Sequence, residues 1–556
     1  MTLTECEADL LRRLAETPFA DRLDLAALSG WSRGAVYAAM DRLTEGGMAS
    51  AVPHAAPLLP PTRRYFLTVE GLAEVADLEK VSQDVLLRRR PVSSRWQRVL
   101  LERLETLGVI YRLAAAIANV EFPVSIRLFR ATPADAGIVL PGGRTVAILR
   151  QGDTADRTGF AKRLWRLREG TQPGGLLALA PDLVRLRQAR RMLAGASFPV
   201  FTALERDASL AGPDSRLWFP PSVPTALDLR SALARLERGA GLPTEDPESQ
   251  PQLPPVIDLD LPSAAAPRWL LPTLLSPAEK GALDLLCDWP WASRQELSGI
   301  MGVSSRRASQ LLARLGEFGL VGHAGGPRTQ RLAVTDRGLA LLARRDRASL
   351  GAARRRWSIA PLDVAKPLTW RNVSGSRSRQ LLRNVEHTGA VHRFLAALAE
   401  QARAAGWQVA QLDPPRRASR YFHYDGRLHS VLPDAFGIMR RGNATVPFFL
   451  EWERRAVRPV TMATRLAPYL RYYSSHRPLD DHGVQPIVLV VFDDELAATH
   501  FLNLARREMD QAGVEVPLLV SNRAALEGLG PMGRAWLVAG DWERRHAFAA
   551  IGDSGD

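Results

Sequence analysis

Apolar residues recur at helical spacing near the start of the chain, and a strand-like stretch follows them. In residues 24–48, apolar side chains at positions 25, 28, 36, 40 and 43 mark the inner faces of two helices. Gly30 supplies a turn between them, and Ser32 is suited to cap the second helix. The sequence RRYFLTVEG, residues 63–71, predicts the return strand of a hairpin, with Arg63 and Arg64 at its tip. Helix, turn, helix and hairpin together are typical of a winged helix.

The same pattern recurs in the second half of the chain, which indicates an internal duplication. Residues 296–320 match residues 24–48, and each copy is followed by a Thr-x-x-Gly-Leu signature at Thr68 and Thr335. Residues 100–118 then match residues 381–399, with Gly108 opposite Gly389. A later run aligns at identical internal spacing: Gly212, Pro213, Arg216 and Trp218 with Gly530, Pro531, Arg534 and Trp536.

After the second predicted winged helix, the pattern changes to short apolar strands alternating with helices. The order is α, β, β, β, α, β, α, β, which predicts a mixed sheet with helices on its faces. A stretch rich in proline and acidic residues lies between the two halves and predicts an extended linker. The expected fold is therefore α+β or α/β and multidomain: a winged helix over residues 1–85, an α/β domain over 86–237, a linker over 238–270, a winged helix over 271–350 and an α/β domain over 351–556. Two related halves favour an internal pseudo-dimer, with a homodimer as the alternative.

The net charge of the chain indicates which class of partner it binds. The 556 residues contain 73 Lys and Arg against 59 Asp and Glu, a formal net charge of +14, so polyanions are the natural partners. No apolar run is long enough to span a bilayer and the first residues do not resemble a signal peptide, so we expect a soluble, cytoplasmic protein. Two cysteines are too few for a disulfide framework.

The predicted recognition helices carry side chains suited to reading double-stranded DNA. Arginine bonds guanine edges or phosphates, glutamine bonds adenine, and hairpin arginines neutralise phosphates. The DNA-binding candidates are Arg33, Tyr37, Arg63 and Arg64 in the first copy, and Ser304, Ser305, Arg306, Arg307, Gln310, Arg328 and Arg331 in the second. Arginine runs at 88–90, 344–345 and 354–356 favour further phosphate contacts. The alternative is that these modules dock proteins.

The stretch LPDAFGIMRRGNATVPFFLEWERR, residues 432–455, places an acid after a proline and two more acids at the end of the next apolar strand. This arrangement resembles the PD-(D/E)XK nuclease superfamily. The resemblance implies that Asp434 and Glu451 bind a metal such as Mg²⁺ and that Glu453 is a third acid of the site. Glu453 stands where the superfamily has a lysine, and Tyr469 lies where some relatives carry a helical tyrosine.

The segments LPDAFG, FFLEWERR and RLAPYLRYY, taken with the helix-turn-helix, resemble the replication-relaxation family, which is associated with plasmids and integrative elements. The resemblance extends from about residue 276 to about residue 540 and reaches the first half only through the repeat. It implies DNA handling on mobile elements.

The first half offers an internal comparison for the acidic positions. It keeps an acid at Asp135, but we expect Arg150 opposite Glu451, Gly152 opposite Glu453, and Leu167 opposite Tyr469. The first copy is therefore not expected to bind a metal in this way.

Three hypotheses follow. The first is a double-stranded DNA-binding protein with two winged helices, which acts in replication, mobilisation or maintenance of a plasmid or other mobile element together with replication or mobilisation proteins. The second is an Mg²⁺-dependent endonuclease or nickase that uses Asp434, Glu451 and Glu453. The third is a transcriptional regulator. Because the motif lysine is missing, a non-catalytic domain is favoured over the nuclease.

Overall fold

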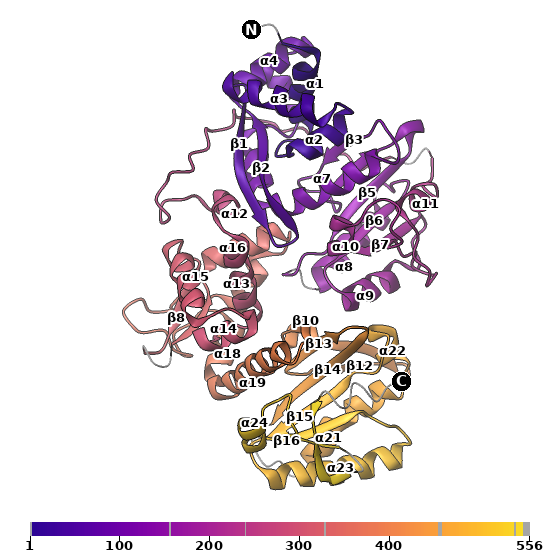
Figure 1. Cartoon of the computed structure of the whole chain (residues 1–556), viewed down its shortest axis with the longest axis vertical. Coiled ribbons are helices and arrows are strands. Elements are labelled where there is room, and N and C mark those ends of the chain that lie inside the picture. Colours follow the sequence, from indigo (N-terminus) through magenta and orange to yellow (C-terminus); the bar gives the residue numbers. More distant parts are fainter. Residues whose placement is uncertain are drawn as a thin grey trace. The chain divides into compact units, whose positions relative to one another are not determined.

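The protein divides into two compact units, shown as a computed structural model in Figure 1. The structure describes residues 3–154, 157–238, 241–326, 330–453, 459–538 and 541–548. The first unit comprises Met1–Gly281 and Arg337–Ala353, and the second comprises Ala282–Asp336 and Arg354–Asp556. Both combine helices with a mixed sheet, so the predicted multidomain α/β class is confirmed at this level. Residues 337–353 belong to the first unit, although residues 337–350 were expected in the domain over 271–350 and residues 351–353 in the domain over 351–556.

The N-terminal segment of the first unit contains the predicted helix, turn, helix and hairpin. Its elements are α1 (Glu5–Glu16), α2 (Arg22–Ser29), α3 (Arg33–Glu45), β1 (Ala49–Ala56), β2 (Leu59–Leu67) and α4 (Val69–Glu79). Gly30 ends α2 with a φ of 79°, a left-handed conformation that glycine adopts at little cost. The Ser32 hydroxyl then accepts a hydrogen bond from the Ala35 N–H at the start of α3. One detail of the prediction is wrong: the strands meet near residues 57–58, so Arg63 and Arg64 lie within β2 and not at the hairpin tip.

A five-stranded sheet follows in the first unit. Its elements and neighbouring helices are α5 (Gln83–Arg89), α6 (Ser94–Glu102), α7 (Leu104–Ala118), β3 (Ser125–Leu128), β4 (Ala136–Val139), the 3₁₀ turn η1 (Pro141–Gly143), β5 (Thr145–Arg150), α8 (Arg157–Glu169), β6 (Leu176–Ala180), α9 (Leu183–Leu193), β7 (Val200–Leu204), α10 (Glu205–Leu210) and α11 (Leu229–Leu233). The strand order is β3-β4-β5-β6-β7; the first two pairings are antiparallel and the next two are parallel.

The predicted linker is extended. Residues 241–267 contain no helix or strand, and the chain then forms η2 (Arg268–Leu270) and α12 (Leu271–Leu274). Glu245 attaches the linker to the first unit, because its carboxylate accepts hydrogen bonds from the backbone N–H groups of Arg130 and Thr132.

The helix-rich part that follows repeats the order seen at the N-terminus. Its elements are α13 (Pro277–Asp288), α14 (Arg294–Met301), α15 (Ser305–Glu317), β8 (Val321–Ala324), β9 (Arg331–Val334), α16 (Asp336–Arg345), α17 (Leu350–Trp357), α18 (Ser376–Arg383) and α19 (Val385–Ala404). Gly302 and Ser304 occupy the turn and the helix cap between α14 and α15, as Gly30 and Ser32 do between α2 and α3.

The second unit carries a seven-stranded sheet whose first five strands repeat the pairing pattern of the first sheet. The strand order is β10-β13-β14-β15-β16-β17-β18, antiparallel up to β14 and parallel from β14 to β16. Its elements are β10 (Gln408–Asp413), α20 (Pro415–Ala418), β11 (Arg420–Tyr424), β12 (Arg427–Val431), β13 (Ala435–Arg441), β14 (Ala444–Glu453), α21 (Pro459–Tyr473), α22 (Arg477–His482), β15 (Ile487–Phe492), α23 (Glu495–Ala512), β16 (Leu518–Asn522), α24 (Arg523–Leu529), β17 (Trp536–Val538) and β18 (Asp541–His546). The predicted mixed sheet with alternating helices is confirmed, but between α19 and β16 the structure also contains α20, α22 and a separate hairpin of β11 and β12, which the predicted order lacks.

An arginine–carboxylate pair with a buried carboxylate recurs in both units at equivalent places. Arg64 on β2 is fully buried and donates to Asp24 on α2 over 2.8 Å. In the second unit, Arg331 on β9 pairs with Glu296 on α14 over 2.6 Å. Each pair ties the return strand of a hairpin to the first helix of the helix-turn-helix.

The matched glycines Gly108 and Gly389 explain why the long helices α7 and α19 pass so close to these pairs. A Cβ at Gly108 would lie 2.8 Å from an Arg64 guanidinium nitrogen, and one at Gly389 would lie 2.6 Å from that of Arg331. A Cβ at either position would displace the guanidinium, so helix-turn-helix, hairpin and long helix meet at one arginine in each unit.

We expect Asp24→Asn to destabilise the first unit, because it leaves the buried Arg64 guanidinium without its nearest counter-charge. The cost expected for breaking a buried ion pair is about 3 kcal/mol, measurable as a lower urea denaturation midpoint. Asp84→Asn is the control, since Asp84 pairs with Arg88 on the exposed surface of α5 and should leave the midpoint unchanged. Equal midpoints for the two variants would contradict the structural role of the pair.

Candidate functional site

Three acidic side chains lie together at one edge of the second sheet. Asp434 immediately precedes β13, and Glu451 and Glu453 lie at the end of the adjacent β14. The pairing of Ala435 with Leu450 brings these strand ends side by side. Because side chains alternate along a strand, Phe448, Leu450 and Trp452 pack in the core with α19, whereas Glu451 and Glu453 point to the opposite face, toward α21.

Backbone and side-chain donors hold the Asp434 carboxylate. Its Oδ2 accepts a hydrogen bond from the Trp452 N–H over 2.9 Å, and its Oδ1 lies 3.1 Å from His387 Nε2 on α19. The Asp434 N–H donates to the Leu450 carbonyl over 2.9 Å, which extends the ladder between the two strands by one residue. Asp434 therefore joins the strand end to α19.

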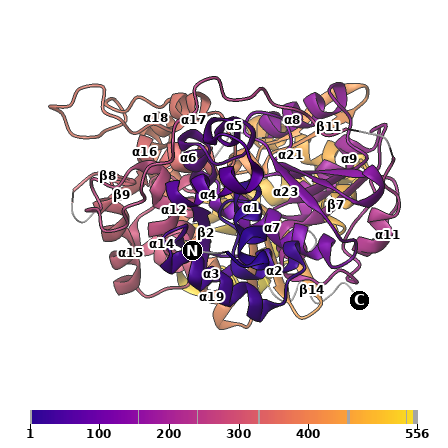
Figure 2. The same ribbon diagram turned by 90° about the horizontal axis from the view of Figure 1, so that it is seen from above.

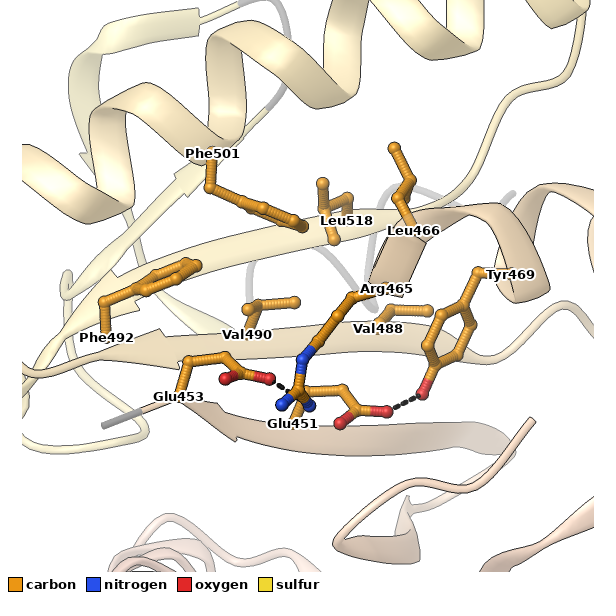
Figure 3. A pocket seen from close by; sticks show the side chains of 10 residues that line it. All are labelled: Glu451, Glu453, Arg465, Leu466, Tyr469, Val488, Val490, Phe492, Phe501 and Leu518. Atoms are coloured by element: carbon orange, nitrogen blue, oxygen red, sulfur yellow. Dashed lines mark hydrogen bonds and ion pairs between the residues drawn. The ribbon is translucent and has the colours of Figure 1, made fainter. Parts of the chain in front are cut away.

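The two glutamates contact different groups on α21 (Figure 3). The Tyr469 hydroxyl donates to Glu451 Oε1 over 2.6 Å, and Arg465 forms an ion pair with Glu453. Burial, followed by the negative charge of Asp434, raises the pKa of Glu451 well above its usual range. Burial also raises the pKa of Glu453, against the opposing effect of Arg465. Burial in this cluster and the nearby carboxylate of Asp434 thus oppose ionisation of Glu451.

The cavity beside these glutamates is small. It measures about 20 Å³ and lies between α21, α23 and the strands β14, β15 and β16, lined on its far side by Phe492 and Phe501. A space of this size accommodates roughly one water molecule and no nucleotide base. Any contact with a nucleic acid at this edge would therefore have to occur at its mouth.

This arrangement does not fit a preformed Mg²⁺ site. Magnesium requires several oxygen ligands at near-octahedral geometry. Here one Glu451 oxygen accepts from Tyr469, Glu453 is paired with Arg465, and Asp434 is held by Trp452 and His387. In the part of the chain that the structure describes, no group of three His, Cys, Asp or Glu residues is placed to hold a metal ion.

Two residues of this cluster were not assigned to a site from the sequence. His387 shows no paired metal-ligand spacing, yet it lies against Asp434, which is 47 positions away in the chain. Arg465 on α21 forms an ion pair with Glu453, which gives it a role in the cluster. Its position four residues before Tyr469, on the same helical face, is the sequence signal for such a contact.

The equivalent edge of the first sheet shows that the expected correspondence is shifted by one residue. Asp135 N–H donates to the Ile148 carbonyl, and Asp135 Oδ2 accepts from the Arg150 N–H, as Asp434 does with Leu450 and Trp452. In this register Leu149 stands at the Glu451 position and Gln151 at the Glu453 position, and not Arg150 and Gly152 as expected from the sequence. Asp135 precedes Arg150 by 15 positions, whereas Asp434 precedes Trp452 by 18, so the correspondence depends on the size of a gap that only the strand register fixes.

In the first half, the strand and the helix that faces it both carry apolar residues where the second half has polar ones. Leu149 packs with Leu167 of α8 in one apolar cluster, where the second half has the Glu451–Tyr469 hydrogen bond. Arg163, four residues before Leu167, bonds Asp135 over 2.8 Å. An apolar contact therefore replaces the polar pair, and the helical arginine contacts a different acid in each sheet.

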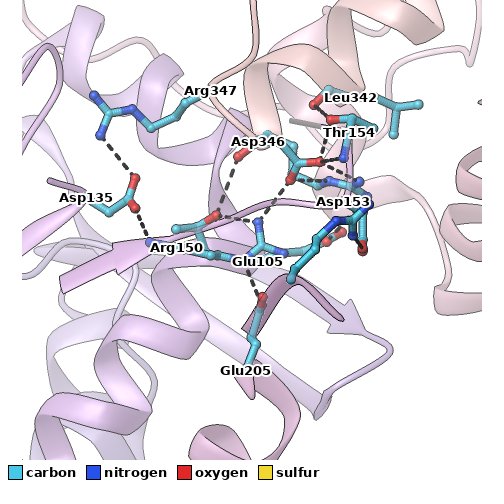
Figure 4. A network of polar contacts seen from close by, with 12 residues as sticks. Glu105, Asp135, Arg150, Asp153, Thr154, Glu205, Leu342, Asp346 and Arg347 are labelled. Atoms are coloured by element: carbon cyan, nitrogen blue, oxygen red, sulfur yellow. Dashed lines mark hydrogen bonds and ion pairs between the residues drawn. The ribbon is translucent and has the colours of Figure 1, made fainter. Parts of the chain in front are cut away.

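A charged network closes this edge of the first sheet (Figure 4). Asp346, which follows α16, accepts from Arg150 Nη1 over 2.9 Å and from the Thr154 N–H over 2.9 Å. Arg150 also donates to Glu205 over 2.7 Å, and Arg347 donates to Asp135 over 3.1 Å. Asp346 also approaches Gly152 so closely that a Cβ added there would lie 2.3 Å from the Asp346 Cγ. A larger residue at position 152 would therefore disturb the network. The edge is thus filled by side chains from residues 345–347.

The predicted recognition helices present most of the DNA-binding candidates to solvent. Arg33 and Tyr37 are exposed on α3, and Ser304, Ser305, Arg306, Arg307 and Gln310 are exposed at the start of α15. In the first hairpin Arg63 is exposed as well. These positions satisfy the first requirement for contact with DNA.

Two hairpin arginines do not fit the predicted DNA contacts. Arg64 is fully buried against Asp24, so the prediction for it is wrong. Arg331 is mostly covered, and Glu296 already holds its guanidinium, so its predicted role in neutralising phosphates is also corrected. Arg328 lies outside the described residues.

The second unit thus has a mixed α/β sheet with an acidic cluster at the ends of its central strands. A helix-turn-helix precedes this sheet in the chain. A comparison with protein families matches residues 293–488 to the replication-relaxation family, and the resemblance noted from the sequence is confirmed for this region. Searches of the curated proteins and of the solved structures found no match. None of the described helices has both the length and the apolar character needed to cross a membrane.

The network around Asp346 should make unfolding sensitive to acid. Burial opposes ionisation, but Arg163 and Arg347 outweigh it and lower the pKa of Asp135 to about 2. Arg345 and Arg150 likewise outweigh burial and lower the pKa of Asp346. Because both pKa values are depressed, this stabilisation is complete above the unfolded pKa of about 4 and is lost as the pH falls toward 2. Glu205, whose pKa is raised by burial, acts in the opposite direction.

Asp346→Asn is expected to lower the free energy of unfolding by about 3 kcal/mol near neutral pH, because it leaves Arg150 short of one counter-charge. The variant should also show a smaller decrease in the free energy of unfolding when the pH is lowered. Urea denaturation of the wild type and the variant at about pH 7 and about pH 3 measures both effects. A variant that loses the same stability as the wild type on acidification would show that Asp346 does not carry this dependence.

Proposed function

We propose that the chain is a double-stranded DNA-binding protein that uses tandem winged helices, related by internal duplication, in the replication, mobilisation or maintenance of a plasmid or other mobile element. The observation that carries this proposal is the start of α15, where Arg306, Arg307 and Gln310 are exposed on the first turns of a capped helix. A recognition helix contacts base edges with its N-terminal residues, and these side chains match guanine, phosphate and adenine.

Electrostatics support the same proposal. The chain carries a formal charge of +14, and the first turn of α15 contains no acid to oppose its two arginines. The N-terminal end of a helix also favours phosphate through its backbone N–H groups. The match to the replication-relaxation family supports a role in replication or in the relaxation of a mobile element. Replication or mobilisation proteins are the partners we expect, and a cytoplasmic location follows from that role.

The α3 helix of the first half is a second reader in this proposal. Arg33 and Tyr37 are exposed there, and the Arg22 guanidinium lies 5.0 Å from the centre of the Tyr37 ring. A surface with one arginine and one tyrosine offers fewer base-specific donors than α15. In this proposal α3 therefore contributes mainly to the affinity for DNA, and α15 contributes the selectivity for particular bases.

A second candidate function is an Mg²⁺-dependent endonuclease or nickase, and the convergence of Asp434, Glu451 and Glu453 at one sheet edge favours it. Cation binding would relieve the repulsion between Asp434 and Glu451, which contributes to the raised pKa of Glu451. The Arg465 contact of Glu453 and the missing lysine weigh against it. We therefore place DNA binding without cleavage first.

DNA binding is tested by Arg306→Ala combined with Arg307→Ala, measured by fluorescence anisotropy on a labelled duplex over a salt series. We expect the affinity to fall about tenfold or more, and the salt dependence to weaken by about one unit of slope for each lost phosphate contact. Arg314→Ala, on the last turn of the same helix, is the matched control and should bind like the wild type. Unchanged affinity of the double variant at every salt concentration would rule out α15 as a DNA reader.

Cleavage is tested by incubating supercoiled plasmid with the protein and Mg²⁺ or Mn²⁺, with a chelator as control. On the proposal of a non-catalytic domain, the wild type and the Asp434→Ala plus Glu451→Ala variant should leave the same amount of intact plasmid. Nicking by the wild type that both the chelator and the variant abolish would establish the nuclease instead. A duplex-binding measurement on the same variant separates loss of chemistry from loss of binding.

A further inference from the structure

The segment from residue 354 to residue 383 is strongly basic and has no role in the function proposed above. It contains eight lysines and arginines and a single acid, Asp363. The cationic residues are Arg354, Arg355, Arg356, Lys366, Arg371, Arg377, Arg379 and Arg383, and all are exposed. Asp363 pairs with Lys366 over 3.0 Å, and the other cations leave the segment with a net positive charge, which favours a polyanion as its partner.

The middle of this segment is a loop with a fixed shape. Hydrogen bonds between Ser374 and Ala360 (3.0 Å) and between Gly375 and Ser358 (2.9 Å) close its neck. Inside, the buried Asn372 amide donates to the carbonyls at positions 363, 366 and 367 over 2.9–3.1 Å and accepts from the N–H at position 363 over 2.8 Å. One side chain thus replaces the backbone pairing that a strand would provide, and the loop is pre-organised.

The neck of the loop packs on the hairpin that follows α15. Ile359 and Val373 are buried in one apolar cluster with Ala324 of β8 and Ala333 of β9. A Cβ added at Gly322 of β8 would lie 2.7 Å from Ile359, which shows how closely the neck and the hairpin approach. The loop, the hairpin and α15 all belong to the second unit. The neck of the loop therefore has a fixed position on the hairpin that follows the predicted DNA reader.

The exposed part of the loop combines aliphatic and cationic side chains. Leu362 and Val364 at the tip are 61% and 88% exposed, although both are apolar. Trp370 is 38% exposed, and the guanidinium groups of Arg371 and Arg383 lie 4.8 and 5.7 Å from its ring centre. The indole therefore orients two cations, as in a cation–π contact. Figure 2 shows the loop reaching away from α18.

We propose that this loop is an accessory DNA-binding arm that grips the duplex next to the site contacted by α15. Lys366, Arg371 and Arg383 contact phosphates, and Leu362 and Val364 enter the minor groove. Aliphatic side chains cannot stack on single-stranded bases as aromatic rings do, whereas they pack against sugars and base edges in a minor groove. The inference rests on the proposed function, and it adds a second contact that the helix-turn-helix alone does not provide.

The phosphate contacts are tested on the full chain with Arg371→Ala combined with Arg383→Ala, using anisotropy of a labelled mixed-sequence duplex over a salt series. The plot of log affinity against log salt should become shallower by about 2, because two phosphate contacts are lost. Arg506→Ala with Arg507→Ala, two exposed arginines on α23, is the matched control and should keep the wild-type slope. Equal slopes for the two double variants would overturn the phosphate contacts.

The groove contact is tested with Leu362→Ser combined with Val364→Ser. No charge is removed, so we expect the affinity for the duplex to fall about tenfold at every salt concentration, with an unchanged slope. Affinity for a single-stranded oligonucleotide should be unaffected. Because both side chains are exposed, thermal unfolding should match that of the wild type. Loss of binding to the single strand but not to the duplex would overturn the assignment to a duplex groove.

The α15 variant separates this inference from the function on which it rests. If Arg306→Ala with Arg307→Ala abolishes duplex binding while both loop variants bind like the wild type, the accessory arm is wrong and the proposed function stands. If the wild type binds no duplex at any salt concentration, both are wrong. Weakened binding by both the loop variants and the α15 variant supports both.

Discussion

An arginine of the hairpin paired with a buried carboxylate of the first helix is the contact on which each helix-turn-helix depends. In the first unit Arg64 and Asp24 join β2 to α2, and in the second Arg331 and Glu296 join β9 to α14. Removing a cation from water is costly, and the cost is offset only while the carboxylate stays in place. The glycine opposite each guanidinium lets the long helix of the adjoining α/β region pass over it. The orientation of the exposed helix is thereby linked to the sheet that follows.

The two sheets show how one framework can hold different side chains at the same edge. The acid that precedes the second strand is kept in both, as Asp135 and Asp434, and in both it accepts a hydrogen bond from the backbone of the next strand. That contact extends the ladder and does not depend on catalysis, which explains why an acid can persist there without a metal. The residues that differ face α8 in the first sheet and α21 in the second, where Leu149 of the first sheet stands at the position of Glu451 in the second. The chemistry that is possible at the edge of the second sheet therefore depends on the side chains of the sheet face opposite the long helix α19.

Much of this organisation could be predicted from the sequence, because it depends on local periodicity. The helices, the mixed sheet and the clustering of Asp434 with Glu451 follow from the apolar pattern and the antiparallel pairing. The failures involve contacts between distant residues. The burial of Arg64 depends on Asp24, forty positions away, and the one-residue shift at Leu149 depends on strand register. Nothing in the local pattern distinguishes a buried hairpin arginine from an exposed one.

The network around Asp346 has a consequence for how the chain can be divided. The first sheet is completed by Asp346 and Arg347, almost two hundred residues after Arg150. A fragment that stops at the linker would retain the pairs of Arg150 with Glu205 and of Asp135 with Arg163. It would lose Asp346 and Arg347, which supply the second counter-charge of each pair. During synthesis the first unit likewise cannot reach its final state until the segment after α16 has left the ribosome, although domains commonly fold in order from the N-terminus. The folding of the first unit is thus completed by residues that follow the linker in the chain, and the linker is not a boundary between two independently folding parts.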